Sequence, residues 1–105
     1  MTRQPGWLLG VAGDAVRRMA LFHLLEREGL RATVADDTHA ALTMLRTEPF
    51  DLVLLDSSSP LFNSGAILTE IRADPLLRRL PVLVLTNPTD HRELARVLPQ
   101  LMNDA

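Results

Sequence analysis

The chain has 105 residues, of which 47% are hydrophobic and 23% charged, and its formal net charge is -2. This length suits one globular domain, and the arginines are spread along the chain rather than gathered on one face, which argues against direct nucleic-acid binding. Cysteine is absent, so disulfides, thiolate metal sites and cysteine nucleophiles are excluded. Neither a signal-peptide core nor a run of membrane-spanning length occurs, so we expect a cytoplasmic protein without a membrane segment.

The first predicted unit is a strand, a turn and a helix. The strand is the apolar run 7–11, and the turn ends at Asp14, which is placed to cap the helix. Gly29 is a plausible stop for that helix. Apolar residues recur between them at helical spacing: Val16, Ala20, Leu21, Leu24 and Leu25.

The same unit then repeats. A short second strand covers 32–35, and Asp36-Asp37-Thr38 caps a helix that uses Ala41, Leu42 and Leu45. The third strand is the run 51–56. Its four central residues are all Val or Leu, which is typical of a strand buried on both faces.

Two more helices and one more strand complete the pattern. A helix around 67–71 stops near Ala73-Asp74-Pro75, because proline disfavours a helical residue before it. A fourth buried strand covers 81–85, and a last helix uses Leu94, Val97 and Leu98. Strands that alternate with helices predict an α/β fold: a three-layer, doubly wound parallel sheet.

Asp56 is the most informative residue of the chain. It ends the buried third strand, and Ser57-Ser58-Ser59-Pro60 forces a loop directly after it. Loops that follow the carboxyl ends of parallel strands build ligand sites, so Asp56 is a candidate site residue. The alternative is a structural carboxylate that caps the following loop through backbone N–H groups.

The order and spacing of these segments resemble the receiver domain of bacterial two-component response regulators. The resemblance covers nearly the whole chain and rests on 24–29, 51–56, Pro60, 71–74 and 80–86. It implies a flavodoxin-like fold and one domain over residues 1–105. Receivers continue with a fifth strand, a Lys-Pro dipeptide and a fifth helix, so we expect a C-terminally short receiver of about four βα units.

The resemblance also implies a site. Asp56 matches the aspartate that a partner histidine kinase phosphorylates, and Thr86 matches the switch hydroxyl. Receivers hold Mg²⁺ with an acidic pair after the first strand, a position that Ala12 and Gly13 occupy here. If the alignment with the family is shifted by one residue, Asp14 falls on the second acidic position. Asp14 and Asp56 are therefore the candidate metal ligands. The alternatives are purely structural roles: Asp14 would cap a helix, and Thr86 would be an ordinary β-branched residue at the end of a strand.

We therefore hold three hypotheses. The first is a non-enzymatic, degenerate receiver that works as a protein-interaction module. It would associate with itself, as a homodimer, or with a histidine kinase or other signalling protein, through the fourth strand, the last helix and the exposed flank of the first helix. The second is a working phosphoacceptor that uses Asp56 with Mg²⁺. The third is a fragment of a longer response regulator. The three histidines share no ligand spacing and are expected on the surface, and Ser57 to Ser59 lack a nucleophile elbow.

Overall fold

The computed structural model describes residues 7–57, 64–86 and 96. In chain order the elements are β1 (Trp7–Ala12), α1 (Ala15–Arg27), β2 (Arg31–Ala35), α2 (Thr38–Thr47), β3 (Leu52–Asp56), α3 (Ser64–Ala73) and β4 (Val82–Leu85). The predicted loop at 58–63 and the predicted helix with Leu94, Val97 and Leu98 lie outside the described residues. The described elements fall where the sequence predicts them.

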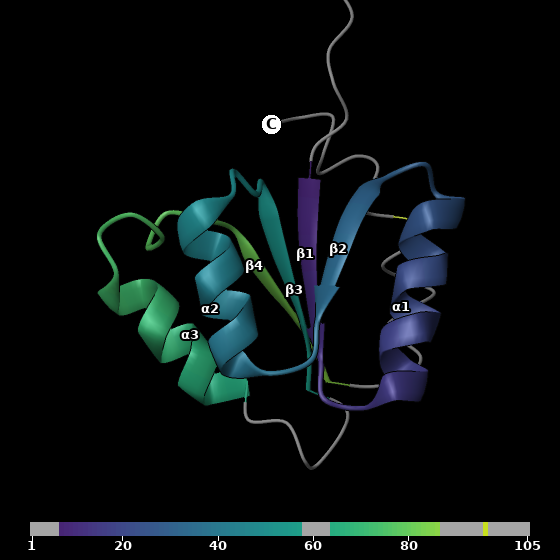
Figure 1. Cartoon of the computed structure of the whole chain (residues 1–105), viewed down its shortest axis with the longest axis horizontal. Coiled ribbons are helices and arrows are strands. Elements are labelled where there is room, and N and C mark those ends of the chain that lie inside the picture. Colours follow the sequence, from purple (N-terminus) through teal and green to yellow (C-terminus); the bar gives the residue numbers. More distant parts are fainter. Residues whose placement is uncertain (1–6, 58–63, 87–95, 97–105) are drawn as a thin grey trace, which may run out of the picture.

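The four strands form one parallel sheet in the order β2-β1-β3-β4. Figure 1 shows α1 on one face of this sheet and α2 with α3 on the other. The predicted three-layer, doubly wound architecture is therefore confirmed. Because all strands run the same way, the residues that end β1, β3 and β4 meet at one edge, which we call the carboxyl edge.

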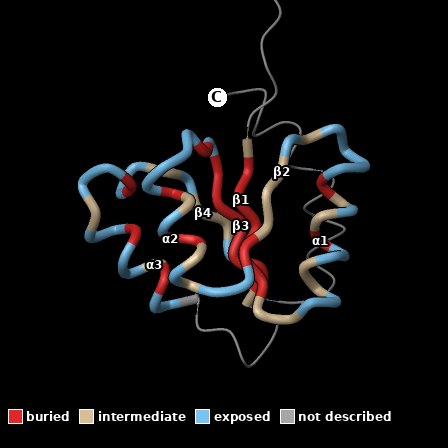
Figure 2. The backbone as a smooth tube through the Cα atoms, viewed as in Figure 1, coloured by how far each residue is buried: buried red, intermediate tan, exposed pale blue. Residues whose placement is uncertain are grey.

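The core consists of two apolar layers, one on each face of the sheet. Leu8, Leu52 and Leu54 pack with α1, while Leu9, Val53 and Leu55 pack with α2 and α3. All five residues of β3 are buried, as Figure 2 shows by its colour. The prediction that β3 is covered on both faces is confirmed.

Gly10 brings α1 close to the sheet. A Cβ atom at this position would lie 2.9 Å from Leu21 Cδ2, which is closer than real Cβ contacts allow. The absence of a side chain in the middle of β1 therefore lets the fully buried Leu21 reach the strand.

Two sequence expectations about burial are wrong. The strand β4 was expected to be buried, yet Val84 is 41% exposed, because within the described residues β4 pairs with β3 alone. Val16 and Ala20 were expected on the apolar stripe of α1, but both are exposed. Val16 lies about 140° around the helix from Leu21, so it points away from the sheet that Leu21 and Leu25 contact.

The helix ends follow the predicted chemistry. Asp14 Oδ1 accepts the Val16 N–H at 2.8 Å and caps α1, and Asp37 Oδ1 accepts the Ala40 N–H at 2.7 Å and caps α2. Gly29 follows α1 with a φ of 74°, a left-handed conformation that favours glycine. Both predicted caps and the glycine stop are confirmed.

Asp74 closes the third helical segment. Its Oδ1 accepts the Leu76 N–H at 2.9 Å, and its Oδ2 lies 3.0 Å from Arg46 Nε on α2. The Leu76 N–H, and after it the Arg46 guanidinium, hold the pKa of Asp74 below its ordinary value. The charged form of Asp74 is therefore favoured in the folded state.

This shift predicts a contribution to acid unfolding. Because the folded-state pKa of Asp74 is the lower one, its stabilisation is present above the unfolded-state pKa and is lost as the pH falls through the folded one. We expect Asp74→Asn to unfold more easily than the wild type at pH 7, with a difference that narrows below about pH 4. Urea unfolding across this range measures it, with the exposed Asp36→Asn as control. A constant difference at all pH values would contradict the assignment.

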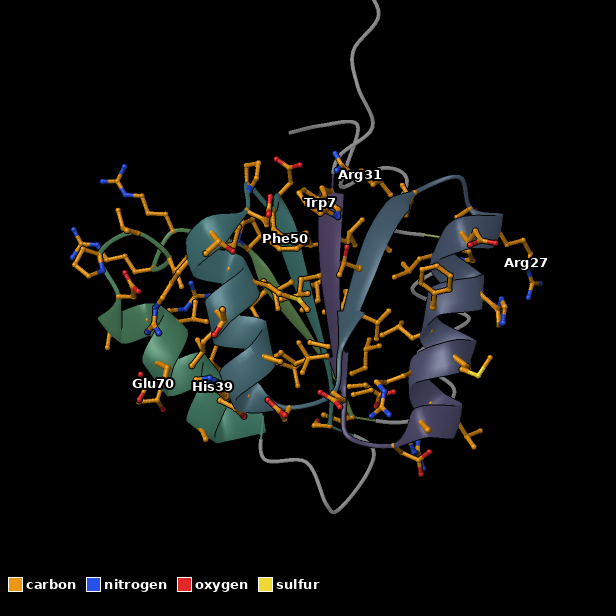
Figure 3. The ribbon with its side chains drawn as sticks, in the orientation of Figure 1. Trp7, Arg27, Arg31, His39, Phe50 and Glu70 are labelled. Carbon is orange, nitrogen blue, oxygen red and sulfur yellow. The ribbon has the colours of Figure 1, made fainter. Side chains whose placement is uncertain are left out.

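An aromatic cluster fixes the opposite, amino edge of the sheet. The Trp7 ring lies 4.4 Å from the Phe50 ring, and the Arg31 guanidinium lies 3.8 Å from the Trp7 ring centroid. Trp7 Nε1 also donates to Thr33 Oγ1 at 3.1 Å. Figure 3 shows Trp7, Phe50 and Arg31 together at this edge. Trp7 therefore joins β1, β2 and the segment before β3.

The sequence predicts surface positions for the three histidines. His23 and His39 are exposed as predicted, and His91 lies outside the described residues. Among the described residues, no helix has both the length and the apolar composition needed to cross a bilayer.

Candidate functional site at the carboxyl edge

The sheet register brings the predicted site residues to one edge. Asp56 ends β3 directly opposite Ala12 of β1 on one side and Leu85 of β4 on the other. Thr86 follows Leu85, and Gly13 follows Ala12. The structure thus places Asp56 in the centre of the carboxyl edge, with the two neighbouring strands ending beside it.

Asp56 is unusual in its burial. Its side chain is 0% exposed. Among the described residues it is the one charged side chain in the core, and the other buried residues are apolar. A buried carboxylate is tolerated only with compensating partners, and no buried side-chain oxygen or nitrogen in the described part lacks one. The carboxylate is therefore built into the fold rather than exposed at a loop tip.

The residues beside Asp56 on β1 carry no carboxylate. Ala12 is fully buried, and Gly13 begins the turn to α1. The first acidic residue after Ala12 and Gly13 is Asp14. Its Oδ1 accepts the N–H groups of Val16 and Arg17 at 2.8 and 3.4 Å. Of the two interpretations of Asp14, the observed contacts match the helix cap.

On the other side, β3 is tied to β4 by Ser57. The Ser57 N–H and its hydroxyl both donate to the Leu85 carbonyl oxygen, at 2.7 and 3.0 Å. The Ser57 hydroxyl therefore links the end of β3 to the end of β4. Thr86 follows Leu85, the last residue of β4, and is exposed at the same edge.

Arg18 is a site residue that the sequence did not reveal. It lies in α1, and its Nη1 donates to the Ala12 carbonyl oxygen at 3.0 Å. Nothing in the spacing of the sequence marks Arg18, because the bond depends on the way α1 packs over β1. The result is a guanidinium held at the residue directly opposite Asp56.

Comparison with known proteins decides the family. A family model described as the response regulator receiver domain matches residues 9–105. The chain belongs to this family. It is a receiver domain of two-component signalling with a flavodoxin-like fold, so the family prediction is confirmed.

Relatives of this receiver domain include chemotaxis proteins. The chain is 44% identical over 80 residues to the chemotaxis protein CheY-3 of Vibrio cholerae, an alignment that covers 75% of this chain and 62% of that protein. It is 37% identical over 80 residues to the chemotaxis protein CheY of Pseudomonas aeruginosa, with coverages of 75% and 64%. The chain thus spans less than two thirds of the length of these relatives.

Solved structures agree on the fold. The N-terminal domain of a response regulator receiver protein from Methanoculleus marisnigri is 31% identical, with a TM-score of 0.70, and the match covers 85% of this chain and 76% of that one. The receiver domain of the sensor histidine kinase PA1611 from Pseudomonas aeruginosa is 21% identical, with a TM-score of 0.80 and coverages of 95% and 99%. That structure holds a magnesium ion in its active-site cleft.

The described residues of this receiver domain do not fit the magnesium ion that the family implies. Mg²⁺ prefers carboxylate oxygens and water, yet Ala12 and Gly13 supply no side-chain oxygen, and Asp14 caps α1. Within the described residues no three His, Cys, Asp or Glu side chains gather closely enough to hold a metal. Asp56 is the carboxylate that remains, and the nearby Arg18 guanidinium carries the same sign of charge as the ion.

Proposed function

We propose that this chain is an atypical receiver domain that acts by binding other signalling proteins and in which phosphorylation of Asp56 is impaired. The observation that carries the proposal is the makeup of the carboxyl edge. The fold presents Asp56 at the end of β3, but Ala12 and Gly13 stand where an acidic pair would be needed. Phosphoryl transfer to a carboxylate requires that the charge on the phosphoryl oxygens be offset, and Mg²⁺ usually supplies that offset.

Treatment with a small phosphodonor tests this proposal. In the presence of Mg²⁺ and phosphoramidate, intact-mass spectrometry is expected to find no adduct of about 80 Da on the wild-type chain, because the metal ion that assists the transfer has too few ligands. Samples taken over several hours separate a slow reaction from none. Asp56→Asn serves as the matched control for labelling at other residues.

The second candidate function is a working phosphoacceptor, and the position of Asp56 at the end of β3, between the ends of β1 and β4, favours it. In this case an Asp56 carboxylate oxygen would attack phosphorus and the bond from phosphorus to nitrogen would break. The nitrogen, which already carries three protons in phosphoramidate, would leave as ammonia with the electron pair of that bond. Thr86 would then lie close to the new phosphoryl group. An adduct of about 80 Da that is present in the wild type and absent in Asp56→Asn would establish this function and overturn the first.

A surface for binding proteins is available on α1 and β4. Val16 and Met19 are 77% and 62% exposed on α1, and Val84 is 41% exposed on β4. Exposed apolar groups are features of association surfaces, and so is a strand that pairs on one side only, as β4 does among the described residues. They support binding to another protein, for which the family suggests a histidine kinase or another signalling protein, and self-association of this chain.

Self-association has its own test. Because the apolar groups on α1 would be covered in a dimer, we expect sedimentation velocity to show a dimer at micromolar concentration that Val16→Glu together with Met19→Glu weakens. Glu70→Gln on the exposed surface of α3 is the control. A wild-type chain that sediments as a monomer throughout this range would contradict self-association, although binding to another protein would remain.

A further inference from the structure

The start of α1 places positive charge at the carboxyl edge. No acidic residue lies in the first turn of α1, whereas Arg17 and Arg18 lie at this end of the helix. The amino end of a helix is itself partly positive, and Asp14 offsets this through its cap. The start of α1 therefore adds the guanidinium groups of Arg17 and Arg18 to the carboxyl edge.

Arg18 is held in a defined place at this edge. Its Nη1 donates to the Ala12 carbonyl oxygen at 3.0 Å, and the residue is partly buried. Ala12 is the register partner of Asp56 on the neighbouring strand. Since neighbouring strands lie about 4.8 Å apart, the guanidinium is anchored one strand away from the Asp56 backbone, at the same level of the sheet.

The charge of Arg18 is permanent, because a guanidinium does not lose its proton in a protein. Asp56 is 0% exposed, and a buried carboxylate is stabilised by positive charge nearby. The bond of Arg18 to Ala12, the register partner of Asp56, places such a charge at this edge without any bound ion.

We propose that Arg18 is the fixed counter-charge of the Asp56 site and that it keeps divalent cations out. This inference deepens the proposed function, since a site that excludes Mg²⁺ lacks the usual assistance for phosphorylation. The two ideas fail separately: phosphodonor labelling reports on Asp56 chemistry, whereas the experiment below reports on metal binding alone.

The test adds a ligand and then removes the guanidinium. Gly13→Asp places a second carboxylate at the carboxyl edge. The backbone of Gly13 accepts a side chain, because Gly29 alone among the described glycines has a positive φ. Mg²⁺ is titrated to about 50 mM into Gly13→Asp, Gly13→Asp/Arg18→Gln and Gly13→Asp/Arg27→Gln, and the amide shifts of Ala12 and Ser57 are followed by NMR. Arg27 is the matched control: it lies in the last turn of α1, and Figure 3 shows it pointing away from the sheet.

We expect the Arg18→Gln change to raise the Mg²⁺ affinity of the Gly13→Asp protein about tenfold or more, since it removes one positive charge near the doubly charged ion. The Arg27→Gln change should leave the affinity unaltered. The proposal is overturned if Gly13→Asp/Arg18→Gln binds no Mg²⁺, if it binds no more tightly than Gly13→Asp, or if the Arg27→Gln change helps equally.

A second comparison covers the case in which Gly13→Asp does not fold. Arg18→Gln and Arg27→Gln are then made in the wild-type chain and titrated with Mn²⁺, whose paramagnetism broadens nearby amide signals even at low occupancy. Broadening at Ser57 in Arg18→Gln that exceeds the wild type and Arg27→Gln supports the counter-charge role. Equal broadening in all three proteins overturns it.

Discussion

Leu54→Ala is expected to lower the free energy of unfolding by about 2 to 5 kcal/mol, one of the largest effects of any single change in this chain. Leu54 is 0% exposed in the middle of β3 and packs in the layer that α1 covers. Truncation removes apolar contact and leaves a cavity that β1 and β4 cannot close without moving. Urea unfolding followed by circular dichroism gives the value.

Leu83 is the matched control for Leu54. It is the register partner of Leu54 on β4 and belongs to the same layer, but it is only half-buried. Leu83→Ala should therefore cost clearly less than Leu54→Ala. Equal losses would mean that β4 is as enclosed as β3, which would contradict the burial seen here and the use of β4 as part of an association surface.

Trp7→Ala is expected to cost about 3 kcal/mol, because it removes three interactions at once. The ring contact with Phe50, the bond from Nε1 to Thr33 and the contact with the Arg31 guanidinium all disappear. Thermal and urea unfolding followed by far-ultraviolet circular dichroism measure the loss without relying on the tryptophan signal.

Trp7→Phe separates packing from polar contacts. This variant keeps an aromatic ring near Phe50 but loses the donor to Thr33, whose bond contributes on the order of 1 kcal/mol. Its loss should therefore be well below that of Trp7→Ala. If both variants lose equal stability, the hydrogen bond and not the ring packing dominates, and the proposed role of the aromatic cluster is wrong.

The fold was predictable because its signals are local. The apolar run before Asp56, the caps Asp14 and Asp37, and the stop at Gly29 each reflect chemistry within a few residues, and each appears in the structure. Alternation of strands and helices then leaves few topologies for the sheet. This is why the doubly wound parallel sheet could be predicted from the sequence and the resemblance together.

The errors and omissions concern contacts between distant segments. The composition of β4 is that of a core strand, but the exposure of Val84 depends on what lies next to β4. Nothing in the sequence pattern indicated that Asp51 contacts Trp7. In the structure the Asp51 N–H donates to the Trp7 carbonyl oxygen at 2.7 Å, and Asp51 Oδ2 accepts the Trp7 N–H at 2.8 Å. The two bonds between Trp7 and Asp51 join segments 44 residues apart, and spacing within one segment does not encode such a contact.

The candidate site was predictable in its centre and not at its border. Asp56 could be placed from the strand that it ends, and the absence of acidic residues at 12 and 13 was visible in the sequence. Arg18 could not be placed, because its bond to the Ala12 carbonyl depends on how α1 lies over β1. The electrostatics of the site therefore required the structure.

A metal-dependent phosphoryl analogue tests the central claim most directly. Beryllium fluoride binds carboxylates as an acyl-phosphate mimic when Mg²⁺ assists, so it reports on the whole site without any transfer step. In a ¹H–¹⁵N spectrum of the wild-type chain with Mg²⁺, beryllium and fluoride, we predict no saturable shift at the amides of Asp56, Ser57 and Thr86. Saturable shifts at these residues that vanish in Asp56→Asn would contradict an impaired, metal-excluding receiver site.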